Sequence, residues 1–326
     1  AAMVRPIGID PYYLMFALQS GQIQTQMQKA SKQTAQANLF LGAIQSLLIP
    51  VPPLSEQIRI AKKLSNIWTH VQQIDVESET VSNIISKVKS KILDLAIRGQ
   101  LVPQDPTDEP ASVLLERIRA EKEELIKQGK IKRDKKESFI FRGEDNSYYF
   151  DIPDNWSLCQ LKELFNVCSA KRVRQSDWRT EGVPFYRARE IVKLSDNGFV
   201  DNDLFISEEH YMRVKTECGA PEPGDLMVSG VGTIGKVYVV NFNDRFYYKD
   251  ASVLCLENRT GAIDSQFARY MLESEFVQAQ MKDNSITISA AKEYICVLPP
   301  LAEQKRIVSA IKTAFMHLES IAEALT

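Results

Sequence analysis

The stretch that decides how this chain is organised occurs twice. The first copy reads Pro52-Pro53-Leu54-Ser55-Glu56-Gln57-Ile58-Arg59-Ile60, and the second reads Pro299-Pro300-Leu301-Ala302-Glu303-Gln304-Lys305-Arg306-Ile307. A proline lacks the backbone N–H group and disfavours helical geometry in the residue before it. We therefore predict that a new helix begins after each proline pair, with Ser55 as the N-cap of the first.

Each copy opens a heptad pattern, in which apolar residues follow one another at alternating spacings of four and three. The first seam contains Ile60, Leu64, Ile67, Val71, Ile74, Val81, Ile85, Val88, Ile92 and Leu95, with Ser78 as its polar member. The second keeps the same phase through Ile307, Ile311, Ala314, Leu318, Ile321 and Leu325. This spacing is typical of a coiled coil. We expect the first seam to be a subunit interface, on a helix that ends at Gly99 as its C′ residue.

A second pair of matching segments precedes the two helices. Leu18-Gln19-Ser20 with Gln26-Met27 matches Leu272-Glu273-Ser274 with Gln280-Met281. The later copy closes a globular region. Residues 1–54 are therefore expected to be the end of a domain whose beginning is absent. Recurrence of a motif, a seam and these flanking segments indicates an internal repeat.

Composition places the chain among ordinary globular proteins. It has 326 residues, of which 44% are hydrophobic and 25% charged, with a net charge of −2. This length suits about two domains. No apolar run approaches the roughly 18 residues of a membrane span. The five cysteines are scattered and form no C-x-x-C pair. We therefore expect a reduced, cytoplasmic protein without a metal site.

The pattern along the chain predicts an α+β fold, with a mixed globular domain and long coiled-coil helices. We expect a domain remnant over residues 1–54, a long helix over 55–100, and a linker with a second helix over 101–147. A complete mixed domain over 148–298 and the start of a second long helix over 299–326 would follow. Strands are expected at residues 183–186, 225–229, 236–240, 246–248, 252–256 and 295–298, because these are short apolar runs bounded by turn residues.

Two candidate sites lie inside the mixed domain. The first, Gly230-Val231-Gly232-Thr233-Ile234-Gly235, matches the dinucleotide-binding pattern G-x-G-x-x-G. That pattern requires a helix after the glycines to hold a pyrophosphate, whereas the β-rich run at 237–240 follows here. We favour a strand–turn–strand crossing, and a nicotinamide- or nucleotide-using enzyme is the alternative. No pattern of catalytic residues accompanies the glycines.

The second candidate site is a basic cluster with aromatic residues between the cations. Its cations are Lys171, Arg172, Arg174, Arg179, Arg187, Arg189 and Lys193, and its aromatic residues are Trp178, Phe185 and Tyr186. Arginine suits guanine edges and phosphates, because its planar guanidinium donates to two acceptors at once. The cluster is either a solvated face or a nucleic-acid surface.

Several further motifs resemble those of DNA-specificity (S) subunits of type I restriction–modification systems. Beside the duplicated Pro-Pro-Leu-x-Glu-Gln-x-Arg-Ile, the likeness rests on Arg98-Gly99-Gln100-Leu101-Val102-Pro103-Gln104-Asp105-Pro106, Ile152-Pro153-Asp154-Asn155-Trp156, Gly182-Val183-Pro184-Phe185-Tyr186-Arg187 and Pro223-Gly224-Asp225-Leu226-Met227-Val228-Ser229-Gly230. Together they extend over nearly the whole chain.

The resemblance implies a non-catalytic subunit that reads half of a bipartite site in double-stranded DNA. It also implies partners: modification subunits that methylate adenine with S-adenosylmethionine, and an ATP-driven restriction subunit. S-adenosylmethionine, ATP and Mg²⁺ would all bind to these partners, and this chain would need no cofactor. The expected DNA-binding residues are Lys171, Arg172, Arg174, Arg179, Tyr186, Arg187, Arg189 and Lys236.

This sequence departs from the family pattern, because it carries only one complete recognition domain and a short second helix. A bipartite site would then require a second recognition domain, which a homodimer would supply. The alternative is a coiled-coil scaffold from a truncated specificity gene, which binds protein and reads no DNA.

Overall fold

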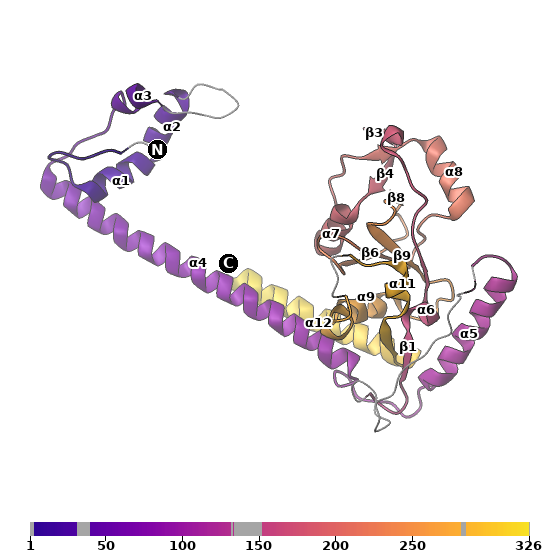
Figure 1. Cartoon of the computed structure of the whole chain (residues 1–326). Helices are drawn as coiled ribbons and strands as arrows, with labels where there is room; N and C mark the ends of the chain where they lie inside the picture. Colours follow the sequence, from indigo (N-terminus) through magenta and orange to yellow (C-terminus); the bar gives the residue numbers. More distant parts are fainter. Residues whose placement is uncertain (1–2, 31–39, 132, 134–151, 282–284, 326) are drawn as a thin grey trace. The chain divides into compact units, whose positions relative to one another are not determined.

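The computed structural model describes residues 3–30, 40–131, 133, 152–281 and 285–325, and their side chains except those of 74–79 and 325. The chain divides into two compact units, residues 1–83 with 325–326, and residues 84–324 (Figure 1). Ile74 of the predicted seam and the predicted domain start at residue 148 lie outside this description. The predicted domain boundaries remain predictions.

The first unit consists of short helices followed by the start of a long one. They are α1 (Pro11–Gln19), α2 (Gly21–Ala30), α3 (Leu41–Gln45) and the beginning of α4 (Leu54–Ile97). Asp10 caps α1, and its carboxylate accepts a hydrogen bond from the Tyr13 N–H at 2.9 Å. Gln57 is buried; its side-chain oxygen accepts from the Asp10 N–H at 2.9 Å and its amide donates to the Pro52 carbonyl at 2.8 Å. The hydrogen bonds of Gln57 therefore connect the start of α4 to the N-cap of α1.

The long helix α4 has 44 residues, as the heptad pattern predicts. The N–H groups of Glu56 and Gln57 donate to the Pro53 carbonyl, so the predicted cap at Ser55 is wrong: that residue lies in the first turn. The predicted end is confirmed, because Gly99 has a φ of +68° and the Gln100 N–H donates to the Leu95 carbonyl at 2.9 Å. This is the geometry of a helix that ends in a left-handed residue.

The second unit repeats the same arrangement around α12 (Leu301–Leu325). The Gln304 side-chain oxygen accepts from the Asp264 N–H at 2.8 Å, and its amide donates to the Pro299 carbonyl at 2.9 Å. Asp264 caps α9 (Ser265–Glu273), just as Asp10 caps α1. The internal repeat predicted from the sequence is confirmed by these equivalent hydrogen bonds.

Within the second unit, α12 runs antiparallel to the last part of α4 (Figure 1). The Lys89 ammonium lies 2.8 Å from a Glu319 carboxylate oxygen and 5.1 Å from the centre of the Phe315 ring. Ile307 and Ile311 are fully buried in the same core as residues 93, 96 and 97. The second helix therefore covers the C-terminal end of α4.

The mixed domain is built on three small sheets. Their strand orders are β2-β9-β6-β7, β3-β5-β4-β8 and β1-β10. The strands are β1 (Ser157–Gln160), β2 (Asn166–Cys168), β3 (Trp178–Arg179), β4 (Val183–Tyr186), β5 (Phe205–Ile206), β6 (Leu226–Ser229), β7 (Val237–Val239), β8 (Tyr247–Tyr248), β9 (Val253–Glu257) and β10 (Ile295–Leu298). The predicted α+β class is confirmed, and each of the six predicted strands is present within one residue or so at either end.

Helices cover these sheets and connect their strands. They are α5 (Ala111–Lys127), α6 (Leu161–Leu164), α7 (Ala188–Asn197), α8 (Glu208–Cys218), α10 (Glu275–Gln278) and α11 (Ile288–Lys292), with a 3₁₀ turn at Gln175–Asp177. The sequence predicted α5 and missed α7 and α8. It also predicted no strand at residues 157–160, which form β1 because they pair with β10.

The glycine-rich segment connects the antiparallel strands β6 and β7, so the predicted strand–turn–strand crossing is confirmed. Gly232 and Gly235 have φ values of +72° and +77°, which side chains other than glycine rarely adopt. A Cβ atom on Gly232 would meet no heavy atom within 4 Å, but one on Gly235 would lie 2.5 Å from the Gln278 side-chain oxygen. Of these two glycines, only Gly235 is therefore closely packed.

Alanine substitutions should distinguish these two glycines. Gly232→Ala is expected to lower the free energy of unfolding by about 1–2 kcal/mol through backbone strain alone. Gly235→Ala adds about 0.5–1.5 kcal/mol, because the end of the Gln278 side chain must move away from its hydrogen bonds to the Gly235 and Leu272 carbonyls. Urea unfolding of both variants measures the difference, and equal losses would contradict the packing argument.

The buried glutamine should matter more than its exposed neighbour. Gln304→Ala leaves the Asp264 N–H and the Pro299 carbonyl without their partner, and an unpaired buried polar group costs about 1–3 kcal/mol. We expect the free energy of unfolding to fall by about 2 kcal/mol or more. Lys305→Ala on the exposed face is the matched control, and it should leave the urea midpoint nearly unchanged.

Candidate nucleic-acid interface

A basic cleft with a volume of about 590 Å³ lies in the mixed domain, between the start of α7, the β6–β7 turn and the segment that follows β8. Its lining residues are Arg187, Ala188, Arg189, Val192, Lys193, Val231, Gly232, Thr233, Lys249 and Ser252. Four of these ten residues are cations, and none of the described lining residues is acidic. The cleft thus concentrates positive charge in a chain whose net charge is −2.

Parallel pairing of two short strands brings the cations together. Tyr186 of β4 pairs with Tyr248 of β8, so the residues that follow each strand, Arg187 and Lys249, lie at the same sheet edge. The Lys249 N–H donates to the Tyr186 carbonyl at 2.8 Å. The Gly230 N–H donates to the Ser252 carbonyl at 2.9 Å, which brings the glycine turn to this edge. The sequence missed Lys249, because nothing in the local pattern indicates a parallel partner 62 residues away.

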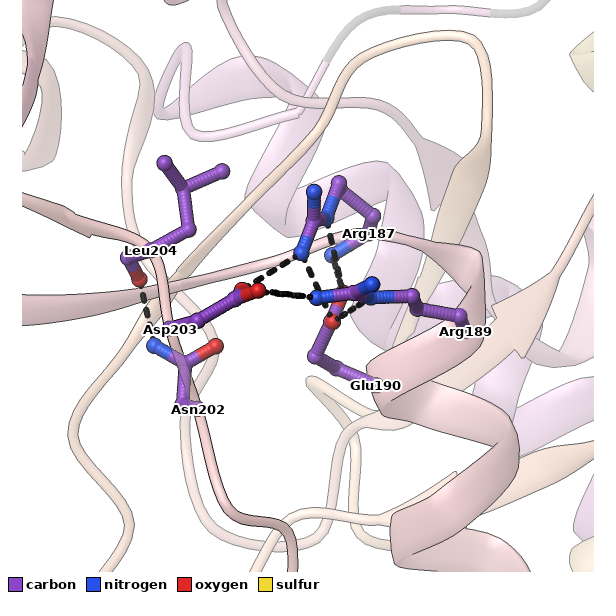
Figure 2. Close-up of polar contacts among 6 residues, drawn as sticks. All are labelled: Arg187, Arg189, Glu190, Asn202, Asp203 and Leu204. Atoms are coloured by element: carbon purple, nitrogen blue, oxygen red, sulfur yellow. Dashed lines mark hydrogen bonds and ion pairs between the residues drawn. The ribbon is translucent and has the colours of Figure 1, made fainter. Parts of the chain in front are cut away.

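Two of the predicted DNA-binding residues, Arg187 and Arg189, share a pair of carboxylates (Figure 2). Arg187 donates to both Glu190 oxygens, with its Nε at 3.1 Å and its Nη2 at 3.0 Å. The Arg187 Nη2 also donates to Asp203 at 2.8 Å, and the Arg189 Nη2 lies 2.7 Å from each Asp203 oxygen. Arg189 also contacts Glu190 through its Nε. Each guanidinium therefore contacts both acids.

The two acids differ in how they are held. Glu190 is only 1% exposed, and as the third residue of α7 it also accepts the Arg187 backbone N–H at 2.9 Å. Asp203 is 67% exposed and lies on the segment before β5. Its neighbour Asn202 donates from its side chain to the Leu204 carbonyl, which orders that segment (Figure 2). Glu190 is thus a fixed part of α7, and Asp203 is a surface residue.

The ionisation of the group follows from these contacts. Burial would raise the pKa of Glu190, but hydrogen bonds from Arg187 and Arg189 outweigh it and hold that pKa below its ordinary value. The hydrogen bond from Arg189 lowers the pKa of Asp203, and both acids raise the pKa of Arg189. Glu190, Asp203 and Arg189 are consequently charged at neutral pH.

The other predicted DNA-binding residues do not line this cleft. Lys171 pairs with Glu217, Arg172 lies 3.1 Å from Asp250, and Lys236 lies 2.6 Å from Asp196. Arg179 donates to the backbone carbonyls of residues 176 and 178. Arg174 is exposed, and Tyr186 is half-buried with its ring centre 4.7 Å from that of Phe246. Of the predicted basic cluster, Arg187, Arg189 and Lys193 line the cleft, and the structure adds Lys249 to them.

Residues 4–79 and 153–324 match the family described as the type I restriction modification DNA specificity domain. The chain belongs to this family. The resemblance predicted from the motifs is therefore confirmed.

Individual relatives support the same assignment. The chain is 27% identical over 328 residues to the type I restriction enzyme EcoAI specificity subunit of Escherichia coli, covering 93% of this chain and 54% of that protein. It is 44% identical over 100 residues to the EcoEI specificity subunit of Escherichia coli, covering 31% of this chain and 16% of that protein. The specificity-domain chain thus spans about half the length of the EcoAI relative.

A solved structure on the assembly and conformational transition of the type I R-M system contains a chain with a similar fold. The TM-score is 0.58 at 19% sequence identity, and the match covers 97% of this chain and 66% of that one. At this identity the likeness concerns the fold alone. It agrees with the α+β class and the long helices described above.

The predicted seam of this specificity-domain chain is unevenly covered. Leu64, Ile67 and Val71 are exposed, and so is the neighbouring Trp68. Ile60, Val81, Ile85, Ile92 and Leu95 are partly buried, and Val88 is 38% exposed. Beside α12, the most buried α4 residues are Leu93, Ala96 and Ile97, which the heptad reading did not include.

No group of three or more His, Cys, Asp or Glu side chains among the described residues is arranged to hold a metal ion. None of the described helices combines the length and apolar character needed to cross a membrane.

Proposed function

We propose that this chain is a non-catalytic DNA sequence-recognition component of a type I restriction–modification complex, and that its mixed domain contacts one half of a bipartite DNA site. The observation that carries the proposal is the basic cleft, in a chain of the DNA specificity domain family. Cations that line one cleft provide the local positive potential that DNA backbones require, even when the net charge is near zero.

The side chains of the cleft suit both contacts with base edges and contacts with backbone phosphates. Arginine can donate to the O6 and N7 atoms of guanine, and both arginine and lysine can neutralise phosphates. Methyl transfer and DNA cleavage are assigned to partner subunits, which would carry S-adenosylmethionine, ATP and Mg²⁺. The modification and restriction subunits are the proposed protein partners.

Removing the paired arginines should weaken DNA binding. Arg187→Ala with Arg189→Ala is expected to cost about 1–3 kcal/mol if a base edge is contacted, and to reduce the salt dependence if phosphates are contacted. Fluorescence anisotropy of a labelled duplex at several salt concentrations measures both quantities. Arg117→Ala is the matched control, because Arg117 is exposed on α5 and pairs with Glu109 away from the cleft.

Unchanged affinity and salt slope in the folded double variant would reject the cleft as the DNA surface. If wild-type protein also failed to bind DNA but bound protein partners, the scaffold alternative would be supported instead.

We further propose that the exposed part of the seam is a subunit interface. Leu64, Ile67, Trp68 and Val71 lie at heptad-related positions on one part of α4 and are all exposed. Burying a large apolar side chain contributes about 1.5–3 kcal/mol, so four of them favour association. A second copy of this chain would cover this exposed stripe of four apolar side chains. It would also supply the second recognition domain for a bipartite site.

A charge within this stripe should prevent self-association. Ile67→Asp is expected to shift the chain from dimer to monomer at micromolar concentration, because a carboxylate cannot be buried unpaired without a large cost. Sedimentation velocity measures the state. Asn66→Asp, at an exposed position of the same helix, adds the same single negative charge outside the stripe and is the control. Wild-type protein that sediments as a monomer without partners would exclude the homodimer and leave a modification subunit as the cover.

A further inference from the structure

The arrangement of Arg187, Arg189 and Asp203 has the geometry of an occupied anion site. Both oxygens of the Asp203 carboxylate accept from one nitrogen of Arg189 at 2.7 Å, and one of them also accepts from Arg187 at 2.8 Å. Two oxygens on one central atom are also what a phosphodiester presents with its two non-bridging oxygens. Guanidinium groups bind carboxylates and phosphates in the same planar manner.

The charges of the group also fit one phosphodiester. Two arginines and two carboxylates balance while Asp203 is in place. When Asp203 leaves, the two guanidiniums and Glu190 keep a net charge of +1, which matches the single negative charge of one backbone phosphate. Glu190 stays, because it is buried, bonded to both guanidiniums and to the Arg187 backbone N–H.

We propose that Arg187 and Arg189 form a binding site for one DNA backbone phosphate, and that the Asp203 carboxylate occupies this site in the free protein until the phosphate displaces it. The inference rests on the proposed DNA-binding function and adds a ligand group and a competing residue to it. No covalent bond is made or broken in the exchange, and one anion replaces another on the same hydrogen-bond donors.

The exposures of the two acids support an exchange at Asp203. An ion pair with an exposed carboxylate is weak, because water and salt screen it, so the 67% exposed Asp203 can be released at low cost. Glu190 meanwhile holds both guanidiniums in position, and the site stays formed without its internal anion. Because backbone phosphates carry no sequence information, Asp203 weakens binding to DNA of any sequence.

The decisive variant removes the internal anion and keeps the shape of the side chain. Asp203→Asn should bind a random-sequence duplex about two- to fivefold more tightly than wild type, because the exposed carboxylate no longer competes. The gain should shrink as salt is raised. Asp201→Asn is the matched control: it makes the same charge change two residues away, at an exposed side chain for which no contact with either arginine is present among the described residues.

A second set of variants tests whether the gain in DNA affinity depends on the two arginines. Asp203→Asn in the Arg187→Ala, Arg189→Ala background should give no gain, because the competition requires the guanidiniums. Asp203→Ala repeats the removal of charge with a different side chain, and circular dichroism confirms that each variant is folded.

The outcomes separate the inference from the proposed function. If the two arginines prove necessary for DNA binding but Asp203→Asn and Asp203→Ala bind no more tightly than Asp201→Asn, the inference is wrong and the DNA-binding function stands. An equal gain in Asp203→Asn and Asp201→Asn also overturns the inference, since it would be a general charge effect. If the arginine variants bind as wild type does, the cleft assignment and the inference fail together.

Discussion

A buried glutamine carboxamide at the start of each long helix is the interaction on which the rest of this structure depends. Gln304 and Gln57 each accept a hydrogen bond from the N–H of a helix-capping aspartate and donate one to a proline carbonyl. A carboxamide offers a donor and an acceptor on one rigid plane, which neither a carboxylate nor an apolar side chain provides. The bond fixes how each helix leaves the preceding helical segment, and in the second unit α12 then reaches the end of α4.

The two copies of the motif have different surroundings, although their sequences are nearly the same. Glu303 accepts from the Trp156 indole at 2.9 Å and from the Gln104 amide at 2.6 Å, and Arg306 pairs with Asp108 at 2.6 Å. The equivalent Glu56 and Arg59 are 4.0 Å apart, and the Arg59 side chain is 79% exposed. The local motif therefore specifies where a helix begins, while the energetic contribution of its charged residues depends on what packs against them.

The candidate DNA surface follows from the arrangement of charges within the mixed domain and not from overall charge. Most of the predicted cations are paired with acids in the same domain, as Lys236 is with Asp196. The basic cleft differs in two ways. Lys193 and Lys249 line it, and none of its described lining residues is acidic. Asp203, one of the two acids that neutralise the arginines, is exposed. Such a surface can keep a low net charge in the free protein and still present cations to a phosphate backbone.

The sequence by itself determined the elements that local patterns specify. The proline pairs and the heptad spacing located α4 and α12, and the short apolar runs located six strands. The β-rich run after Gly235 favoured a turn between two strands over a dinucleotide loop. Only the tertiary structure decided that residues 157–160 form a strand, that Lys249 lies beside Arg187, and that Asp203 neutralises two arginines. The reason is physical: periodicity reports which face of a segment is apolar, but strand pairing and ion pairs between distant segments are set by how the whole core packs.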